Sequence, residues 1–263
     1  MNIKLSPLQR RYLYSILQEN TGIYKNSTIL VYIIKIQLNW LIFIKIRDKF
    51  TGSMNVIVLI ADIVSSRKIK DRNKIQKNLE GLFKKINKNS GSILSPMTIT
   101  LGDEFQCVYS DAGEIFRHIW KILHAGYPEK IRFSYGIGEI TTRINRQQAI
   151  GMDGPAFYEA REGLFQLKQT DYLFNIRSSN NNSDLVNFIR NSLYFISYHI
   201  EGWKKNRVYI MSLLADGMQV RAIAQKLKIS EQAVYKNIRN GGLQLILELS
   251  KNITGIINNL VKS

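Results

Sequence analysis

The order of strand-like and helix-like segments between residues 56 and 176 constrains the fold of this chain more than any other feature. Apolar runs typical of strands cover residues 56–60, 97–101, 105–109 and 132–140, and helix-spaced apolar residues cover 72–86 and 112–124. Along the chain the order is strand, helix, strand, strand, helix, strand. The two middle strands are joined by a tight turn, so they predict a hairpin.

That order defines the ferredoxin-like arrangement, an α+β fold whose helices pack on an antiparallel sheet. A third helix over residues 154–167 and a strand over 172–176 are predicted to extend it. In this topology the end of the first strand lies beside the hairpin. Side chains from these two places can therefore share one site.

Three acidic residues fall at that predicted meeting point. Asp62 follows the first apolar run, and Asp103 and Glu104 lie in the hairpin turn after Gly102. Carboxylates are ligands that Mg²⁺ prefers, and two metal ions can stabilise the attacking and leaving oxygens of a nucleotidyl transfer. The sequence therefore predicts that Asp62, Asp103 and Glu104 bind Mg²⁺ or Mn²⁺ together with a nucleotide. The simpler alternative is that Gly102 and Asp103 only form a turn, since both residue types are favoured there.

The segment after the first strand suits phosphate groups. Backbone amides, hydroxyls and a cation are offered by Ile63, Ser65, Ser66 and Arg67, and the amide of Gly102 lies in the hairpin turn. We expect these residues to contact the phosphates of the nucleotide.

A polar stretch over residues 177–183 marks a linker, after which the chain is helical. Three short helices are predicted over 208–214, 220–227 and 231–240. Ser230 is the expected N-cap of the third, which ends at two glycines. Small and apolar residues around the turn before Ser230 are typical of a helix-turn-helix.

The second helix of a helix-turn-helix, here residues 231–240, enters the major groove of DNA. Gln232 and Arg239 are predicted to reach base edges, and Lys236 to contact phosphate. The residues predicted to contact double-stranded DNA are Arg221, Lys228, Ser230, Gln232, Tyr235, Lys236 and Arg239. The alternative is a helical hairpin that packs on the rest of the chain or on a partner.

The net charge of +17 favours an anionic partner, and the excess of lysine and arginine is densest towards both ends. The alternative is a lysine-rich composition whose side chains are simply solvated. A single cysteine, Cys107, excludes an intrachain disulfide and a cysteine-based zinc site, so a reducing, cytoplasmic location is expected.

Residues 1–53 form a basic, apolar extension in which Lys35 and Lys45 interrupt the most apolar part. A spanning helix needs about 20 mostly apolar residues, so we expect a folded domain that starts at Met54 and an extension outside it. The alternative is an interfacial membrane anchor. The expected organisation is an extension over 1–53, a nucleotide- and metal-binding domain over 54–176, a linker and connecting helix over 177–202, and a helix-turn-helix domain over 203–263.

Several motifs resemble known families. Asp62-Ile63 and residues 101–105 resemble the metal motifs of class III nucleotide cyclases and of GGDEF diguanylate cyclases, and residues 133–139 are similar to a glycine-containing cyclase strand. Residues 54 to about 245 are more closely similar to the SatD family. That family pairs a palm-like domain, with a Gly-Pro-Ala-Phe segment matching residues 154–162, with a C-terminal helix-turn-helix.

The chain also departs from the cyclase pattern. Phe157 stands where cyclases have a ribose-binding Asn, and Leu101 replaces the first glycine of GGDEF. Arg161 matches the arginine of the cyclase helix, so the resemblance implies a phosphate contact. The alternative is a surface ion pair with Glu159 or Glu162. Metal and phosphate binding are thus expected to be kept, while base and ribose recognition are changed.

Three functions fit these observations. We favour a transcription regulator whose palm-like domain binds a nucleotide with Mg²⁺. The second is a Mg²⁺-dependent nucleotide cyclase or dinucleotide synthase using Asp62, Asp103, Glu104 and Arg161 in catalysis. The third is a degenerate palm that serves as a dimerisation scaffold. A homodimer is expected because a single helix-turn-helix usually reads DNA as a dimer, with residues 243–261 as the candidate dimerisation helix.

Overall fold

The computed structural model describes residues 55–64, 71–100, 102–179 and 183–262, without the side chain of Ser183. These residues belong to one compact unit. The predictions for residues 1–53, and those for Ser65, Ser66 and Arg67, lie outside the described residues. Within the described part of the chain, no helix combines the length and apolarity needed to cross a bilayer.

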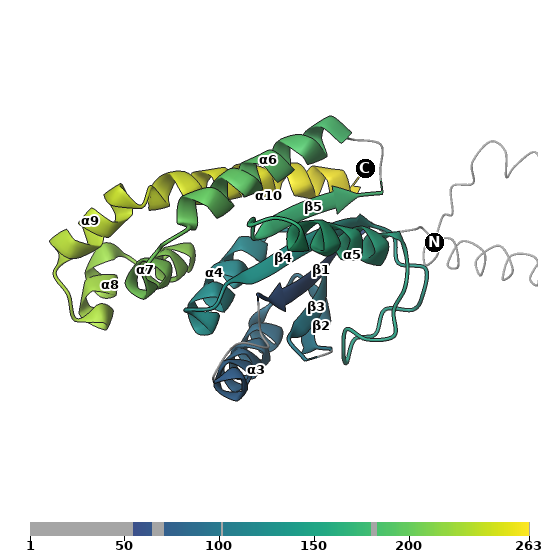
Figure 1. The fold of residues 1–263 in the computed structure, drawn as a ribbon, viewed down its shortest axis with the longest axis horizontal. Helices are drawn as coiled ribbons and strands as arrows, with labels where there is room; N and C mark the ends of the chain where they lie inside the picture. Colours follow the sequence, from purple (N-terminus) through teal and green to yellow (C-terminus); the bar gives the residue numbers. More distant parts are fainter. Residues whose placement is uncertain (1–54, 65–70, 101, 180–182, 263) are drawn as a thin grey trace, which may run out of the picture. The chain divides into compact units, whose positions relative to one another are not determined.

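A five-stranded sheet forms the centre of this unit (Figure 1). Its strands are β1 (Val56–Ile63), β2 (Ile93–Ile99), β3 (Glu104–Tyr109), β4 (Ile131–Gly138) and β5 (Phe174–Ser178), in the spatial order β2-β3-β1-β4-β5. β1 is antiparallel to both neighbours, β3 and β4, while β5 is parallel to β4. With α3 (Arg72–Asn89) between β1 and β2 and α4 (Ile115–Gly126) between β3 and β4, the predicted ferredoxin-like α+β fold is confirmed.

Both faces of the sheet are covered, so β1 is apolar on both sides. Ile57, Leu59 and Ala61 point to the core shared with α3 and α4. Val58 and Ile60 point to a smaller core under α5 (Pro155–Lys168), which covers the opposite face (Figure 1). A strand buried on both faces reads as an uninterrupted apolar run, which explains the pattern over residues 56–60.

α5 packs unusually close to β4 because glycine stands at the point of contact. A Cβ atom placed on Gly136 would lie 2.0 Å from the carbonyl oxygen of Ala156 and 2.5 Å from the amide nitrogen of Ala160. Gly154, with φ of 144°, precedes Pro155 at the start of the helix. The Gly-Pro-Ala-Phe segment therefore has a structural role: it starts α5 and lets it approach the sheet.

Five helices follow the sheet: α6 (Ser183–Ile200), α7 (Lys205–Ala215), α8 (Val220–Leu227), α9 (Glu231–Asn240) and α10 (Leu243–Lys262). α7 packs on α4. Just before α7, the ring of Trp203 stacks on Trp120 of α4 with centroids 6.1 Å apart. α10 runs beside α6 (Figure 1). The buried residues of α10 include Leu243, Ile246, Ile253, Ile257 and Leu260. The apolar face predicted to dimerise is thus already covered within the chain.

α6 buries only one of its apolar sides among the described residues. Ile189, Leu193 and Ile196 are buried, whereas Leu185 and Phe188 are exposed. The helix is apolar on two sides, and periodicity alone cannot decide which of them packs on the sheet.

Candidate functional site

Asp62 lies near the end of β1 in a row of charged residues that crosses three strands. It is directly opposite Glu104 on β3 and opposite Arg132 on β4. Residues directly opposite in antiparallel strands share one face of the sheet. This face is the one covered by α5, because Ile60, two residues earlier, points there.

The carboxylate of Asp62 is almost buried and is compensated by two cations. Its Oδ1 lies 3.7 Å from Nη1 of Arg132, and its Oδ2 lies 3.3 Å from Nζ of Lys168, the last residue of α5. No described residue donates a hydrogen bond to Oδ1. A buried acceptor without a donor is costly, so this oxygen suits a cation or a donor group of a ligand.

Asp103 occupies the hairpin turn and points to a different neighbour. Its Oδ1 lies 3.9 Å from Nη2 of Arg72, the first residue of α3. Gly102 has φ of 66°, and a Cβ atom there would lie 2.7 Å from the same Nη2. Asp103 lines a small hollow with Ile63 and Phe105, which belong to the core under α3 and α4. It therefore lies towards α3, whereas Asp62 and Glu104 lie under α5.

The structure thus brings Asp62 and Glu104 together and leaves Asp103 with Arg72. Among the described residues, no three His, Cys, Asp or Glu side chains lie close enough to hold one metal ion. One or two carboxylates with phosphate or water are a common ligand set for Mg²⁺, so Asp62 and Glu104 are the two described acids that could hold one ion. Ile63 is buried, so it can offer a ligand only its backbone.

The helix residues of the cyclase comparison have other surroundings. Phe157 is only 2% exposed and packs in the core between α5 and the sheet. Arg161 is exposed on α5. Its suggested partner Glu159 instead accepts a hydrogen bond from Nε of Arg177 at 2.6 Å, and Glu162 accepts one from Gln166 at 3.0 Å.

Sequence reasoning missed Arg132 and Lys168, the two cations on Asp62. Arg132 is the second residue of β4, and Lys168 is the last residue of α5, and both are distant from Asp62 in the sequence. Only the strand register and the position of α5 place their charges on Asp62. No local pattern indicates either contact.

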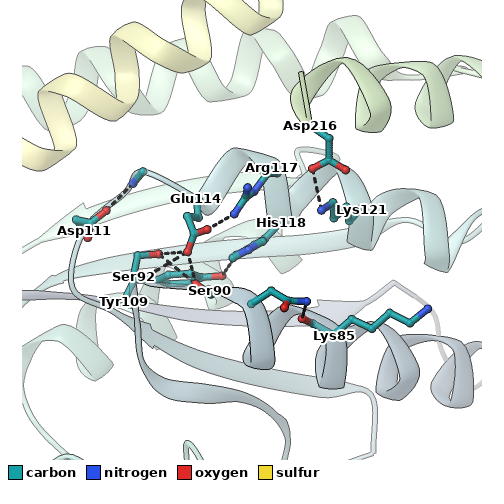
Figure 2. A network of polar contacts seen from close by, with 12 residues as sticks. Lys85, Ser90, Ser92, Tyr109, Asp111, Glu114, Arg117, His118, Lys121 and Asp216 are labelled. Atoms are coloured by element: carbon teal, nitrogen blue, oxygen red, sulfur yellow. Dashed lines mark hydrogen bonds and ion pairs between the residues drawn. The ribbon is translucent and has the colours of Figure 1, made fainter. Parts of the chain in front are cut away.

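A second polar cluster surrounds Glu114 at the start of α4 (Figure 2). Its carboxylate accepts hydrogen bonds from Oγ of Ser90, from the amide and Oγ of Ser92 at 3.2 and 2.9 Å, and from Arg117. Partial burial acts to raise the pKa of Glu114. These hydrogen bonds and the Arg117 charge outweigh burial and lower that pKa to about 2. The cluster ties the start of β2 to α4.

One turn along α4, His118 is buried, and its Nδ1 lies 3.1 Å from the hydroxyl of Tyr109 on β3 (Figure 2). Burial lowers the pKa of His118 to about 4, with the charges of Arg117 and Lys121 acting in the same direction. The imidazole is therefore neutral at pH 7.

α4 also connects the sheet to the C-terminal helices. Nζ of Lys121 lies 2.8 Å from Oδ1 of Asp216, at the end of α7 (Figure 2). The rings of His124 and Tyr209 stack at 3.9 Å. The amide of Ala112, just before α4, donates to Oδ1 of Asn258 on α10 at 2.7 Å. One helix thus contacts both the sheet and the helices that follow it.

The helices α8 and α9 form a helix-turn-helix. Lys228 ends α8 in the left-handed conformation with φ of 54°. Ser230 caps α9 as predicted, since its Oγ accepts the amide of Ala233 at 3.2 Å. Ile223 and Val234 are fully buried between the helices and hold them together.

The opposite side of α9 is exposed and carries polar and basic side chains. Tyr235 is 57% exposed although it is aromatic. All residues predicted to contact DNA lie at the surface, namely Arg221, Lys228, Ser230, Gln232, Tyr235, Lys236 and Arg239. Glu231, the first residue of α9, is exposed as well. The outer face of α9 is thus exposed in the part of the chain that the structure describes.

Two solved structures of a bacterial light-regulated adenylyl cyclase are similar to this chain. The first has 14% sequence identity and a TM-score of 0.35 and covers 61% of this chain, which spans 58% of the length of that chain. The second has 15% identity and a TM-score of 0.34, over 47% of this chain and 75% of that one. No curated protein sequence matches this chain.

A family of proteins does match over most of the chain. The sequence profile of the SatD family covers residues 56–257, from the first residue of β1 into α10. The match thus takes in the sheet, the charged row formed by Glu104, Asp62 and Arg132, and the helix-turn-helix. The chain belongs to the SatD family.

Proposed function

We propose that this SatD-family protein is a DNA-binding regulator. Its helix-turn-helix reads double-stranded DNA, and its palm-like domain binds a nucleotide with Mg²⁺. The observation that carries the DNA part is the outer face of α9, where Gln232, Tyr235, Lys236 and Arg239 are exposed on a helix anchored by buried Val234. The net charge of +17 supports an anionic partner.

The exposed residues divide into two roles on DNA. Gln232 and Arg239 have the side chains that form bidentate contacts with adenine and guanine edges. Arg221, Lys228 and Lys236 carry positive charges that suit phosphates and position the helix. Base contacts would set sequence preference, while phosphate contacts would make binding depend on salt.

Two substitutions separate these roles. Arg239→Ala is expected to weaken binding to a preferred duplex by roughly 5- to 150-fold, because one good base contact is worth about 1–3 kcal/mol. Lys236→Ala should weaken binding to all duplexes alike. It should also reduce, by about one, the slope of the logarithm of the binding constant against the logarithm of the salt concentration. Binding is measured by fluorescence anisotropy, first with a duplex library to find a preferred sequence.

The matched control is Lys84→Ala, which removes an exposed positive charge from α3. This variant should bind DNA as the unchanged protein does. If Arg239→Ala and Lys84→Ala bind equally well at low salt, α9 is not the recognition helix.

The nucleotide part rests on the charged row of the sheet. Asp62 and Glu104 share one face, and Oδ1 of Asp62 accepts no hydrogen bond from a described residue. Arg132 and Lys168 bring two positive charges to the same place. These residues together suit a phosphate group with a bound divalent cation, in which the cation would neutralise phosphate charge.

Equilibrium dialysis of each nucleoside triphosphate with Mg²⁺ or Mn²⁺ tests this part. Asp62→Asn should abolish metal-dependent binding, and Asp103→Asn measures whether the turn acid contributes. Asp153→Asn, an exposed acid that accepts from the hydroxyl of Tyr158, is the control. Equal binding by Asp62→Asn and Asp153→Asn would place the nucleotide elsewhere.

The same samples decide between the other functions. A cyclic or linked product that Asp62→Asn fails to form would make the protein a nucleotide cyclase or dinucleotide synthase. No binding of any triphosphate would leave the palm-like domain as a scaffold.

A further inference from the structure

α6 is apolar on two sides, and among the residues that the structure describes only one of these sides packs on other elements. The buried side packs on β5 and the neighbouring core through Val186, Ile189, Leu193, Ile196 and Ile200. The exposed side carries Leu185, Phe188, Phe195 and Tyr198, which are 46%, 58%, 64% and 72% exposed. We call these four residues the α6 stripe. Three large aromatic rings in water on one helix are unusual for a soluble surface.

The spacing of the α6 stripe is symmetric about the midpoint of residues 185–198. Leu185 lies as far before that midpoint as Tyr198 lies after it, and Phe188 and Phe195 are related in the same way. Two copies of such a helix, placed antiparallel, would set Phe188 against Phe195 at the centre and bring Leu185 and Tyr198 to the same height along the pair, at the edges of the contact. In a two-fold contact residue i meets residue j and residue j meets residue i, so the stripe is complementary to itself.

The residues at the centre and the ends of the stripe fit the same pairing. At the centre are Asn191 and Ser192, which are small enough for helices to approach, and Oγ of Ser192 already donates to the carbonyl of Phe188 at 2.9 Å. At the ends are exposed Asp184 and His199, which are also symmetric about the midpoint. Antiparallel pairing would bring the carboxylate of each copy near the imidazole of the other, whose Nε2 already lies 2.9 Å from the carbonyl oxygen of Gly241 in its own chain.

No charge interrupts the stripe. Arg190 is the one charged residue in the sequence between Leu185 and Tyr198, and it turns towards the sheet, where its Nε donates to the carbonyl of Ile176 at 3.2 Å. In a chain with a net charge of +17, an uncharged strip of this length is suited to contact between two like-charged copies.

We propose that a second copy of this chain packs on the α6 stripe, with the two α6 helices antiparallel. The apolar face of α10, which the sequence suggested for this purpose, is buried within the chain. The dimer depends on neither DNA nor nucleotide, so its absence would leave the proposed function standing.

The area of the stripe is sufficient for the centre of such an interface. With aromatic side chains of about 150–250 Å² each, the exposed parts of the four residues sum to roughly 400–500 Å² per copy. A standard interface buries about 800 Å² per partner. If all four residues are covered, the stripe therefore supplies roughly half of the required area, most of it apolar.

Engineered disulfides in the full chain test the pairing. Phe188 and Phe195 are seven residues apart, about 10 Å along a helix, so cysteines at both positions cannot bond within one chain. The native Cys107 is fully buried. The double variant Phe188→Cys/Phe195→Cys should form a covalent dimer on oxidation, with peptide mapping showing position 188 joined to position 195. Each single variant should remain largely unlinked, and mixing the two should restore the link.

Two results would overturn this proposal. One is a double variant that stays monomeric on oxidation. The other is a pair of single variants that link to themselves as readily as the double variant, because this would mean a parallel or unrelated contact.

A charge placed in the stripe gives an independent measurement. Phe195→Asp should weaken the dimer by roughly tenfold or more, as for the loss of a central aromatic contact. Phe165→Asp is the matched control, since Phe165 is an aromatic residue of α5 that is 59% exposed and lies outside the stripe. Light scattering over a concentration series should show a lower average molecular mass, relative to the unchanged protein, only for Phe195→Asp. A monomeric unchanged protein, or equal behaviour of the two variants, contradicts the proposal.

Discussion

The buried histidine of α4 should make the stability of this protein depend on pH in a defined window. His118 is 3% exposed, and burial lowers its pKa from 6.5 to about 4. Between these two values the unfolded chain binds a proton at this position that the folded chain does not bind. Stability is therefore complete above pH 6.5 and falls as the pH decreases towards 4.

The magnitude follows from the width of this window. Each pH unit in which one more proton is bound by the unfolded state costs about 1.4 kcal/mol, so His118 alone accounts for a loss of about 3 kcal/mol between pH 6.5 and 4. Burial also lowers the pKa of His124, which adds to the loss in the same direction. Glu114, with a pKa of about 2, loses its contribution only as the pH falls from 4.5 through 2.

Urea unfolding at steps between pH 4 and pH 7.5 measures this dependence. His118→Gln removes the titrating group and should reduce the slope of unfolding free energy against pH by about 1.4 kcal/mol per unit in this window. His124→Gln is the control for the second histidine. An unchanged slope in His118→Gln, or an NMR titration of His118 with a pKa near 6.5, would refute the reasoning.

Two further substitutions test the packing of α5 and the cap of α9. Gly136→Ala forces a methyl group against the backbone of Ala156 and should destabilise the protein by about 1–3 kcal/mol or more in urea unfolding. Gly91→Ala, where a Cβ atom would meet nothing within 4 Å, should be nearly neutral, and equal effects would contradict the close packing. Ser230→Ala removes the acceptor for the amide of Ala233 and should lower the free energy of unfolding by about 1 kcal/mol. Ser230→Thr keeps a hydroxyl acceptor and should retain most of that stability. A neutral Ser230→Ala would show that this cap does not stabilise the helix.

The sequence predicts the order of the elements well because that order depends on local patterns. Apolar runs over β1 and helical spacing over α3 each reflect which side of a short segment is buried. The cap at Ser230 is equally local, since its hydroxyl acts within three residues. The exposed face of α9 follows once Val234 is recognised as its buried side.

The candidate acidic site was only partly predictable. The topology alone indicates that Asp62 and the hairpin acids meet. Which face each side chain points to depends on strand register, and a register change of one residue moves a side chain to the other face. In the structure Glu104 lies opposite Asp62 in the neighbouring strand, while Asp103 in the turn forms an ion pair with Arg72.

The amino-acid sequence by itself determined the elements, their ferredoxin-like order, the helix-turn-helix and its surface residues, because each of these rests on contacts within a few residues. Only the tertiary structure decided that Arg132 and Lys168 compensate Asp62, that α10 is covered within the chain, and that α6 exposes an aromatic side. The first outcome depends on strand register and on the position of α5, and the other two depend on which apolar helix face packs on the core. Packing between distant segments decides these outcomes, and local pattern does not contain them.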